Sequence, residues 1–415
     1  LRMLRADVDV GSYLSGGLDS SVIAALGLAA KGRGFHTFSL RFEDAEYDEG
    51  VFQRKMSEYI GSRHHEVVVS RGDIARAFPE TCFHAERPIL RTAPAPMFLL
   101  SKLVREHGIK VVLTGEGADE MFAGYDLFRE SRIRRFWARQ PASASRPRLL
   151  ERLYPYLQRS PVSQRAMAQQ FFGQGLDDAG RPGFGHDMRW RSTAALKRLF
   201  SGELRAQTAG VDSTGALLAG LPAAFARWSP LARDQHLEII TLLAGYLLAS
   251  QGDRMLMAHS VEGRFPFLDR DVAALAASLP ASYKLRVLDE KHVLKRAARG
   301  LVPQAILDRP KQPYRAPDAL SFADAAAEEW IESAASEQAL AQAGVFNPRA
   351  ARQLIEKCRQ RAGAGQFSNA DNMAVVGILS TQLVHHHFVA RRPEASAPPV
   401  IRTVVDRLAM TADTR

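Results

Sequence analysis

Apolar segments of strand length alternate with helical segments through the first 125 residues of the chain. Gly61 and Gly108 each stand directly after such a helical segment, at the position where glycine commonly ends a helix. The expected strands are 8–14, 35–42, 64–69 and 109–114, and the expected helices are 22–30, 48–60 and 97–107. This rhythm predicts a doubly wound, mostly parallel α/β sheet. Because such sheets bind ligands at the carboxyl ends of their strands, we expect a site at the turns after Leu14 and Leu113.

No strand alternation persists from about residue 126 onward, so the rest of the chain is expected to be mainly α-helical. The expected helices there are 127–140, 148–159, 191–206, 234–250, 268–279, 290–299 and 322–340. We therefore divide the chain into three parts. These are an α/β core over 1–125, a mainly helical part over 126–390, and a Pro/Ala-rich, loosely attached tail over 391–415.

Composition excludes several classes of protein. The 415 residues are 46% hydrophobic and 24% charged, which is typical of globular proteins. No uninterrupted apolar run reaches the ~18 residues of a membrane span, so we expect no membrane contact. The cysteines Cys82 and Cys358 lie far apart, which excludes a disulfide framework and suits the reducing cytoplasm. The chain has no signal-peptide core and no initial Met, so we expect it to be a piece of a longer polypeptide.

Charge is concentrated in two places. The net charge is +10, and arginines gather in residues 129–154, which we interpret as a solvated helical hairpin. Nucleic-acid binding is the alternative, and we disfavour it because no nucleic-acid motif accompanies the arginines. The acidic run between Glu43 and Glu49 is likewise interpreted as a solvated loop and helix N-terminus.

The turn after the first expected strand reads SYLSGGLDSSV, residues 12–22. Gly16 and Gly17 let backbone N–H groups approach an anion closely, and the following helix directs its N-terminal dipole at the same place. Hydroxyl donors are added by Ser15, Ser20 and Ser21. A plain helix cap is the alternative, but a loop of this kind between strand and helix favours a phosphate or pyrophosphate cradle. It is not a Walker A loop, since no Gly-Lys-Ser/Thr follows.

Asp19 lies within this cradle and carries the wrong charge to bind phosphate directly. A carboxylate there makes sense as a ligand for Mg²⁺ that bridges the phosphates.

The turn after the fourth expected strand reads VVLTGEGADEMFAGY, residues 111–125. Three carboxylates follow the strand, namely Glu116, Asp119 and Glu120. An acidic helix N-terminus, which the helix dipole favours, accounts for the last two without any function. A helix N-terminus does not account for Glu116, which stands between two glycines. We therefore predict that this turn belongs to a functional site at the ligand edge of the sheet.

Two further motifs lie in the helical half. Residues 251–271 mix apolar side chains with a charged set that we interpret as structural or positioning, namely Asp253, Arg254, Glu262, Arg264 and Asp269. In residues 291–317, Lys291 and Lys295 share one helix face. Lys311 lies in a loop between two prolines, which would present its side chain rigidly.

These four segments, in order, resemble the synthetase domain of the glutamine-dependent asparagine synthetases. That family includes β-lactam synthetases and natural-product amide synthetases. Its pattern is SGGLDSS, then SGEGADE, then DR-x-x-M-x-x-x-x-E-x-R-x-PFLD, then R-x-K. The matching residues here are 15–21, 114–125, 253–269 and 309–311, within a resemblance that covers roughly 5–390. It implies a PP-loop fold of the adenine nucleotide α-hydrolase type, with residues 1–125 binding the nucleotide.

The resemblance also implies a reaction. ATP would activate a carboxylate as an acyl-adenylate and release pyrophosphate, and ammonia or a small amine would then attack. Adenosine would be held by Leu14, Leu40, Thr114 and Gly115, and pyrophosphate by Ser15, Gly16, Gly17, Asp19 and Ser20. Mg²⁺ would be ligated by Asp19 and Asp119, and the phosphates contacted by Lys291. Glu116 would orient or deprotonate the nitrogen, and Lys311 would stabilise the negative charge of the α-phosphate and of the tetrahedral intermediate.

The chain departs from the family pattern in three ways. No segment can be the N-terminal glutaminase domain, so we expect a glutaminase domain or subunit in the full protein. The usual GGY reads Ala123-Gly124-Tyr125. Residues 86–98 replace an acidic EP-x-x-D pattern with Arg91 and Thr92. That change weakens the case for aspartate as the substrate, although a cationic Arg91 would still suit an acidic one.

Alternatives remain open on the substrate and on the class of enzyme. One is an amidotransferase of natural-product biosynthesis that acts on another carboxylate. Enzymes that close β-lactams carry Tyr where Glu116 stands, so an external nitrogen donor is expected. A nucleic-acid thiolating adenylase is disfavoured because two distant cysteines do not supply paired thiols. An inactive nucleotide-binding module is disfavoured by the intact acidic and lysine residues. A homodimer is possible.

Overall fold

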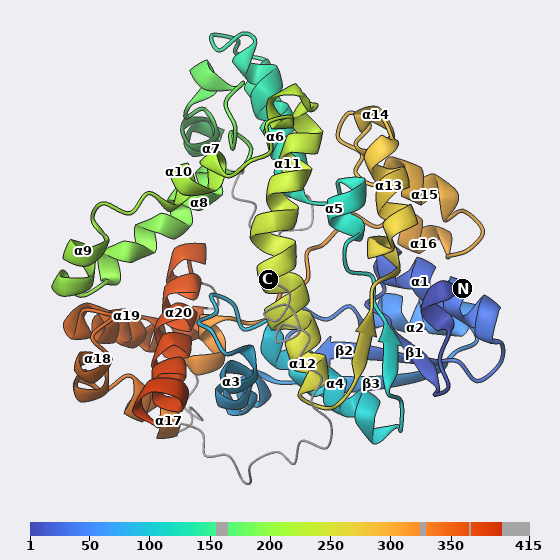
Figure 1. Ribbon diagram of the computed structural model, residues 1–415, viewed down its shortest axis with the longest axis horizontal. Helices are drawn as coiled ribbons and strands as arrows, with labels where there is room; N and C mark the ends of the chain where they lie inside the picture. The colour runs from blue at the N-terminus through green and yellow to red at the C-terminus, as the bar shows by residue number, and fades with distance from the viewer. Residues whose placement is uncertain (155–164, 324–328, 365–366, 392–415) are drawn as a thin grey trace, which may run out of the picture.

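A five-stranded, all-parallel sheet forms the centre of the α/β core (Figure 1). The computed structural model describes residues 1–154, 165–323, 329–364 and 367–391. The strand order is β3-β2-β1-β4-β5. The strands are β1 (Val10–Tyr13), β2 (His36–Phe42), β3 (Arg63–Val69), β4 (Val111–Leu113) and β5 (Glu262–Arg264). The predicted doubly wound parallel sheet is therefore confirmed.

The sheet is covered on both faces, because successive side chains of a strand point to opposite sides. On β4, Val111 and Leu113 pack in the cluster that contains Ile23 of α1, while Val112 packs in the cluster that contains Phe98 of α4. The helices of this half are α1 (Leu18–Lys31), α2 (Gly50–Ile60), α3 (Arg71–Ala85), α4 (Pro94–Glu106) and the short α5 (Ala118–Phe122), after an N-terminal turn η1 (Arg2–Leu4).

The sequence reading missed helix α3 and strand β5. Helix α3 contains Pro79, which disguises its pattern, but Ser70 and Asp73 form a capping box at its start. The prediction of no strand after residue 126 is wrong, because β5 pairs with β4 in parallel. Its three residues, Glu-Gly-Arg, have no apolar alternation, and only the neighbouring strand defines them as a strand. Gly61 and Gly108 have the left-handed φ values expected after a helix.

The described part of the second half is helical apart from β5, and it consists of three groups of helices and one long connecting rod (Figure 1). The upper arm contains α6 (Asp126–Ala138), η2 (Arg146–Arg152), α7 (Arg165–Phe172), η3 (Leu176–Asp178), α8 (Asp187–Ala194), η4 (Ala195–Leu199), α9 (Gly202–Thr208), α10 (Ser213–Ala219) and η5 (Phe225–Arg227). A second group contains η7 (Pro266–Leu268), α13 (Arg270–Ser278), α14 (Ala281–Lys284), α15 (His292–Ala297) and α16 (Gln304–Leu307). The third contains η8 (Ala319–Phe322), α17 (Glu329–Ala334), α18 (Glu337–Ala343), α19 (Pro348–Gln360), η9 (Ala362–Ala364), α20 (Asn369–His385) and η10 (His386–Ala390). Parts of three predicted segments lie outside the described residues. These parts are the end of the predicted helix 148–159, residues 324–328 of the predicted helix 322–340, and the predicted tail from residue 392 onward.

One long helical rod connects the upper arm to the sheet (Figure 1). It consists of α11 (Pro230–Glu238), η6 (Ile239–Asp253) and α12 (Arg254–Met257). Segment η6 follows the wide i→i+5 pattern of a π-helix, which is rare and commonly found at functional sites. The rod places η6 beside the carboxyl edge of the sheet.

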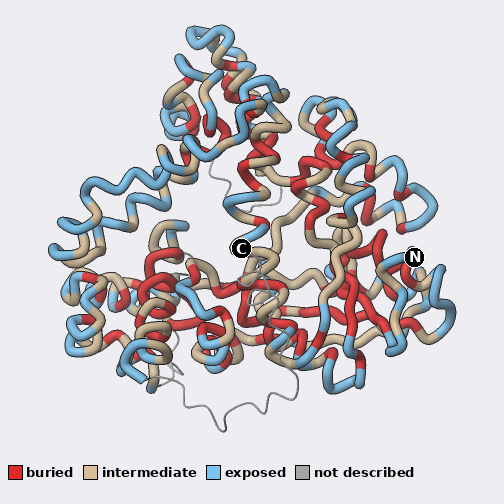
Figure 2. The backbone as a smooth tube through the Cα atoms, viewed as in Figure 1, coloured by how far each residue is buried: buried red, intermediate tan, exposed pale blue. Residues whose placement is uncertain are grey.

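The solvated hairpin that we expected for the arginines of residues 129–154 is confirmed only in part, because Arg139, Arg148 and Arg152 are exposed whereas two others are not. Arg134 is buried and donates hydrogen bonds to three backbone carbonyls, with its guanidinium 4.1 Å from the ring centre of Phe184. Arg135 pairs with the buried Asp234 at 2.6 Å. These guanidiniums hold the upper arm together, because a planar group with five donors can satisfy several carbonyls at once. The tube in Figure 2 shows the buried residues along this arm in red.

Three members of the charged set of residues 251–271 make structural contacts, in agreement with the structural interpretation of this set. Arg264 on β5 donates to the backbone carbonyls of Met3 and Arg5 and pairs with Glu262 at 2.7 Å. Asp269 caps α13 and pairs with Arg2 at 3.0 Å.

One helical stretch in the described chain, Asn369–Ala390, is apolar and long enough to span a membrane by length and composition alone. It is 56% buried over its most apolar part, and Val376, Ile378 and Leu379 belong to the largest hydrophobic core cluster. In this structure it is a core helix.

Candidate active site

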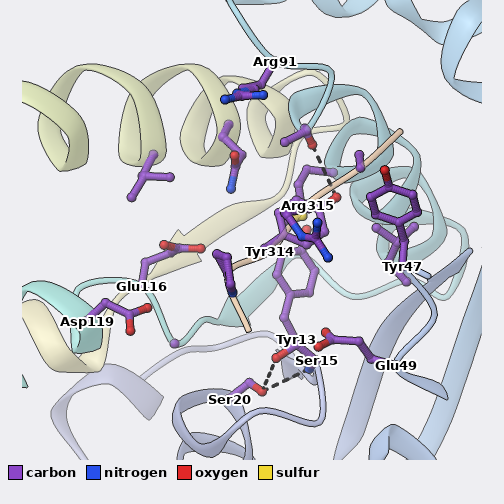
Figure 3. A pocket seen from close by; sticks show the side chains of 18 of the residues that line it. Tyr13, Ser15, Ser20, Tyr47, Glu49, Arg91, Glu116, Asp119, Tyr314 and Arg315 are labelled. Carbon is purple, nitrogen blue, oxygen red and sulfur yellow. Dashed lines mark hydrogen bonds between the residues drawn. The ribbon is translucent and has the colours of Figure 1, made fainter. Parts of the chain in front are cut away.

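A cavity of about 730 Å³ opens at the carboxyl ends of β1 and β4 (Figure 3). The chain proceeds from β1 to β2 and β3 on one side, and places β4 on the other, so the strand order reverses between β1 and β4. Such a switch point leaves a crevice in which α/β sheets bind ligands. Most of the predicted residues line this cavity, namely Leu14, Ser15, Asp19, Ser20, Leu40, Thr114, Gly115, Glu116, Asp119 and Lys311. Gly17 and Lys291 line an adjoining hollow of about 90 Å³.

The expected phosphate loop is preorganised by its own serines. Ser20 Oγ accepts a hydrogen bond from the Ser15 backbone N–H at 3.0 Å and lies 2.8 Å from Ser15 Oγ, as the dashed lines in Figure 3 mark. Helix α1 begins directly after Gly17. Gly16 has φ +72 and lines neither hollow, and a Cβ there would stand 2.7 Å from Phe52 Cβ. Gly16 therefore allows the loop to pack on α2, whereas Gly17 faces the hollow.

The two strand-end loops contact each other directly. A Cβ on Gly115 would stand 3.0 Å from both Asp19 Cβ and the Ser20 backbone nitrogen. Only glycine allows this approach without displacement of the loop. The glycine in the second loop therefore brings Asp19 and Asp119 to one place, as the placement of both motifs at strand ends predicts.

Four charged side chains from four segments form a compact cluster, which we call the Asp–Lys cluster: Asp19, Asp119, Lys291 and Lys311. The Lys291 Nζ lies 2.5 Å from Asp19 Oδ2 and 2.6 Å from Asp119 Oδ1. Lys311 Nζ lies 2.7 Å from Asp119 Oδ2 and 3.9 Å from Asp19 Oδ2. Burial would raise the pKa of Asp119, but Lys291 and Lys311 outweigh it and hold this pKa at about 2. The negative charges of Asp119 and Asp19 raise the pKa of Lys311 despite its burial.

The Asp–Lys cluster also has the donor set of a Mg²⁺ site. Both carboxylates contact the Lys291 ammonium, and Asp19 Oδ1 is in addition buried without a hydrogen-bond partner in the described chain, so it is open to a further cation. Carboxylate oxygens beside phosphates are the ligands that Mg²⁺ prefers. Asp19 and Asp119 therefore fit the ion, with Lys291 as a second cation beside it.

Lys291 is held in a strained backbone conformation. It is 2% exposed and has φ +52, a left-handed value that is uncommon for residues other than glycine. Its side chain passes so close to Gly124 that a Cβ there would stand 2.1 Å from Lys291 Cε. Strain of this kind is concentrated at functional positions. The Gly124 of the altered Ala-Gly-Tyr motif thus serves to admit the lysine.

Glu116 differs from the cluster because its carboxylate makes no hydrogen bond or ion pair with any described residue. Burial, and then the charge of Asp119, raises its pKa to about 7. In Figure 3 its side chain points into the cavity above Asp119. A carboxylate with a pKa near neutrality is suited to accept a proton at physiological pH.

Arg309 ties the loop of Lys311 to the phosphate loop. Its guanidinium donates to Gly16 O at 3.2 Å, pairs with Glu49 and lies 4.2 Å from the ring centre of Phe52. The arginine of the R-x-K motif therefore positions the lysine that follows it.

The lining of the cavity has apolar members. They include Leu14 and Leu40, which we expect at the adenosine, and also Phe38, Phe42 and Met97. The buried Gln53 donates from Nε2 to Leu40 O at 2.8 Å and leaves its Oε1 without a partner in the described chain. An apolar slot edged by backbone and amide groups suits an aromatic base.

Several residues of the cavity were missed by the sequence reading. The acidic run is not wholly solvated, since Glu46 and Glu49 line the cavity. Burial raises the pKa of Glu49, and Arg309 opposes this effect. Leu242, Tyr246, Leu247 and Gln251 of η6 line the opposite side. Counted from Leu242, the cavity-facing positions return after four or five residues, which is the spacing of a π-helix. A search for the 3.6-residue period of an α-helix does not find them.

Arg91 lines the cavity but is not a free cation. It lies at the end opposite Ser15 and Ser20 (Figure 3), where its Nη1 pairs with Asp318 Oδ2 at 2.8 Å and its Nη2 donates to Asn369 Oδ1 at 2.5 Å. The expectation that Arg91 could receive an acidic substrate overlooked Asp318, which is distant in sequence.

Comparisons with known proteins agree with this geometry. The family model described as asparagine synthase matches residues 1–386, and the chain belongs to this family of ATP-dependent enzymes. A putative glutamine-hydrolyzing asparagine synthetase of Mycobacterium bovis is 34% identical over 325 residues, which are 76% of this chain and 46% of that protein. Glutamine-hydrolyzing asparagine synthetase 1 of Bacillus subtilis is 27% identical, with 76% and 47% covered. Amidase chyE of Penicillium rubens is 29% identical, with 76% and 50% covered.

The chain spans about half the length of the curated relatives it matches. The predicted resemblance to the asparagine synthetases is confirmed, and the chain is an asparagine-synthetase-like enzyme.

Proposed function

We propose that this chain forms amides from carboxylic acids in two steps, by ATP-dependent adenylation and then by attack of a nitrogen nucleophile. The observation that carries the proposal is the Asp–Lys cluster beside the free carboxylate of Glu116, at the switch point of the sheet. Two carboxylates for a metal, two ammoniums for phosphates and one base of near-neutral pKa are the groups that this chemistry needs.

In the first step a substrate carboxylate oxygen attacks the α-phosphorus, and the bond to pyrophosphate breaks. The loop from Ser15 to Ser20 would hold the departing pyrophosphate with backbone N–H groups and hydroxyls. Lys291 and Lys311 would compensate the phosphate charge from the opposite side. Asp19 and Asp119 would hold Mg²⁺, which would supply further positive charge to the phosphates.

In the second step a nitrogen attacks the acyl carbon, its surplus proton leaves, and the bond to AMP breaks. Glu116 would accept that proton, since its carboxylate is free and its pKa is about 7. Lys311 would stabilise the oxyanion of the tetrahedral intermediate. The two cysteines are buried, and burial raises the pKa of both Cys82 and Cys358, so neither thiol suits the sulfur transfer of the rival adenylases.

The nitrogen source is a further part of the proposal. The curated relatives named above include glutamine-hydrolyzing enzymes, so a glutaminase domain or subunit would supply ammonia in the full protein. We propose a cytoplasmic enzyme, because free, unpaired cysteines such as Cys82 and Cys358 suit a reducing compartment.

The proposal is tested by carboxylate-dependent exchange of labelled pyrophosphate into ATP, followed by amide formation. We expect exchange without any nitrogen donor, and amide with ammonia but not with glutamine, because both cysteines are buried. Exchange that requires ammonia would contradict a separate adenylate, and efficient use of glutamine by this chain alone would contradict the assigned source.

The pH dependence of the second step tests Glu116. With its pKa at about 7, the rate of amide formation is expected to rise between about pH 6 and pH 8, as the carboxylate ionises. Glu116→Gln is expected to remove this rise and to slow amide formation by about 10²–10⁴-fold, with exchange retained. Hydroxylamine is the preferred nucleophile, because it is less basic than ammonia. An unchanged profile in Glu116→Gln would assign the rise to another group.

A further inference from the structure

The end of the cavity opposite the phosphate loop has its own set of polar residues. We call it the distal wall and define it by Arg91, Tyr246, Asp318, Asn369 and Asn372. The proposed function leaves these residues without a role. Arg91 marks this end in Figure 3, on the far side of Glu116 from Ser15 and Ser20. A substrate whose carboxylate reaches the α-phosphate would extend its other end toward the distal wall.

The charge of the distal wall is already compensated. Arg91 pairs with Asp318 at 2.8 Å, and the other carboxylate oxygen of Asp318 accepts from the Thr92 backbone N–H at 2.9 Å and from Thr92 Oγ1 at 3.1 Å. These contacts hold Asp318 beside Arg91, so the guanidinium offers little net charge to a second carboxylate. Burial of an anion without a free counterion is strongly unfavourable.

The other cations of the cavity are also paired with carboxylates. Arg189 lies 2.6 Å from Glu130, Lys311 lies 2.7 Å from Asp119, and Arg315 lies 3.5 Å from Glu46. In the described chain, seven carboxylates and four cationic side chains line the cavity. Each cation of the lining therefore already has a carboxylate partner and offers little charge to a second carboxylate of a substrate.

Tyr246 supplies the distal wall with a buried hydrogen-bond donor. Tyr246 Oη is buried and makes no hydrogen bond in the described chain, although it lines the cavity. Burial raises the pKa of Tyr246, and the charge of Asp318 adds to this effect, so the hydroxyl keeps its proton. Arg87 Nη1 donates to Gly245 O at 2.7 Å and fixes η6 next to the tyrosine. A buried hydroxyl without a partner is unfavourable, and a ligand acceptor would satisfy it.

We propose that the substrate has a single carboxylate, and that its other end is uncharged and carries a hydrogen-bond acceptor, such as an amide carbonyl, for Tyr246 Oη. This inference rests on the proposed function, because it takes the reacting carboxylate to be at the phosphate end. It disfavours dicarboxylates, including aspartate, as substrates.

Three acids of equal length test the proposal in pyrophosphate exchange with the intact chain. Succinamate has one carboxylate and an amide, butyrate has one carboxylate and a methyl group, and succinate has two carboxylates. We expect kcat/KM for succinamate to exceed that for butyrate by about 10- to 100-fold, the loss typical of an unmade hydrogen bond at a buried group. Succinate is expected to be the poorest. A preference for succinate or aspartate over succinamate would overturn the inference and leave adenylation standing, whereas no exchange with a wider panel of carboxylic acids, longer ones included, would overturn adenylation itself.

Two variants separate recognition from stability. Tyr246→Phe is expected to abolish the advantage of succinamate over butyrate, a change in the ratio of the two substrates that a merely structural tyrosine would not give. Tyr283→Phe, at an exposed position on α14, is the matched control. Asp318→Asn would leave Arg91 uncompensated, and we expect it to raise kcat/KM for succinate relative to succinamate by about tenfold or more. An unchanged succinamate-to-butyrate ratio in Tyr246→Phe would overturn the assignment, even where Asp318→Asn does not fold.

Discussion

Replacement of Asp19 or Asp119 by asparagine is expected to lower pyrophosphate exchange by about 10³-fold or more, while the fold stays intact. A bound metal ion contributes several kcal/mol of charge stabilisation, and each 1.4 kcal/mol corresponds to a tenfold change in rate. Each single variant still leaves Lys291 one carboxylate partner, because its Nζ contacts both aspartates. The buried ammonium therefore does not lose all compensation, and loss of activity would not simply reflect unfolding.

The measurement is exchange rate against Mg²⁺ concentration, together with a thermal melt of each variant. Asp271→Asn is the matched control, since Asp271 is exposed and pairs only with the exposed Arg2 and Arg270 among its described ion-pair partners. We expect the melts of all three variants to resemble the parent, and only the two cluster variants to lose exchange. Normal exchange and an unchanged Mg²⁺ dependence in both would remove Asp19 and Asp119 from the metal site.

Lys311→Ala is expected to slow amide formation by about 10²–10³-fold, equivalent to about 3–4 kcal/mol, by analogy with a removed oxyanion-hole donor. Adenylation should suffer less than in the aspartate variants, or at most equally. Pro310 and Pro313 stiffen the loop, and Asp119 holds Nζ at 2.7 Å, so the cation is in place before charge develops. The raised pKa of Lys311 keeps it charged through neutral pH. Lys311→Arg should not rescue fully, because a guanidinium is larger and spreads its charge over a plane.

Single-turnover measurements of adenylate and of amide decide this prediction. Lys357→Ala is a suitable control, because this lysine also pairs with an aspartate, at 2.9 Å, but lies outside the cavity on α19. Parent-like rates in Lys311→Ala for both steps would show that the ammonium does not act on the reacting groups.

The local character of the main motifs made much of the site predictable from sequence. A strand that ends in Ser-Gly-Gly followed by a helix specifies a loop of open N–H groups, because glycine conformation and helix direction are local properties. Two such loops at the ends of parallel strands must meet at one edge of the sheet. They approach so closely that a Cβ on Gly115 would crowd Asp19. Lys311 was also predictable, since its prolines and the preceding arginine are sequence neighbours.

Contacts between distant segments decided the rest. Strand β5 exists only through pairing with β4, and the spacing of η6 residues on the cavity follows a π-helix rather than the usual period. The sequence shows that residue 91 is an arginine. Only the tertiary structure shows that Asp318 lies beside it and neutralises its charge toward a substrate. The physical reason is the same in each case. Strand pairing and electrostatic compensation depend on neighbours in space, whereas turns and helix ends depend on neighbours in the chain.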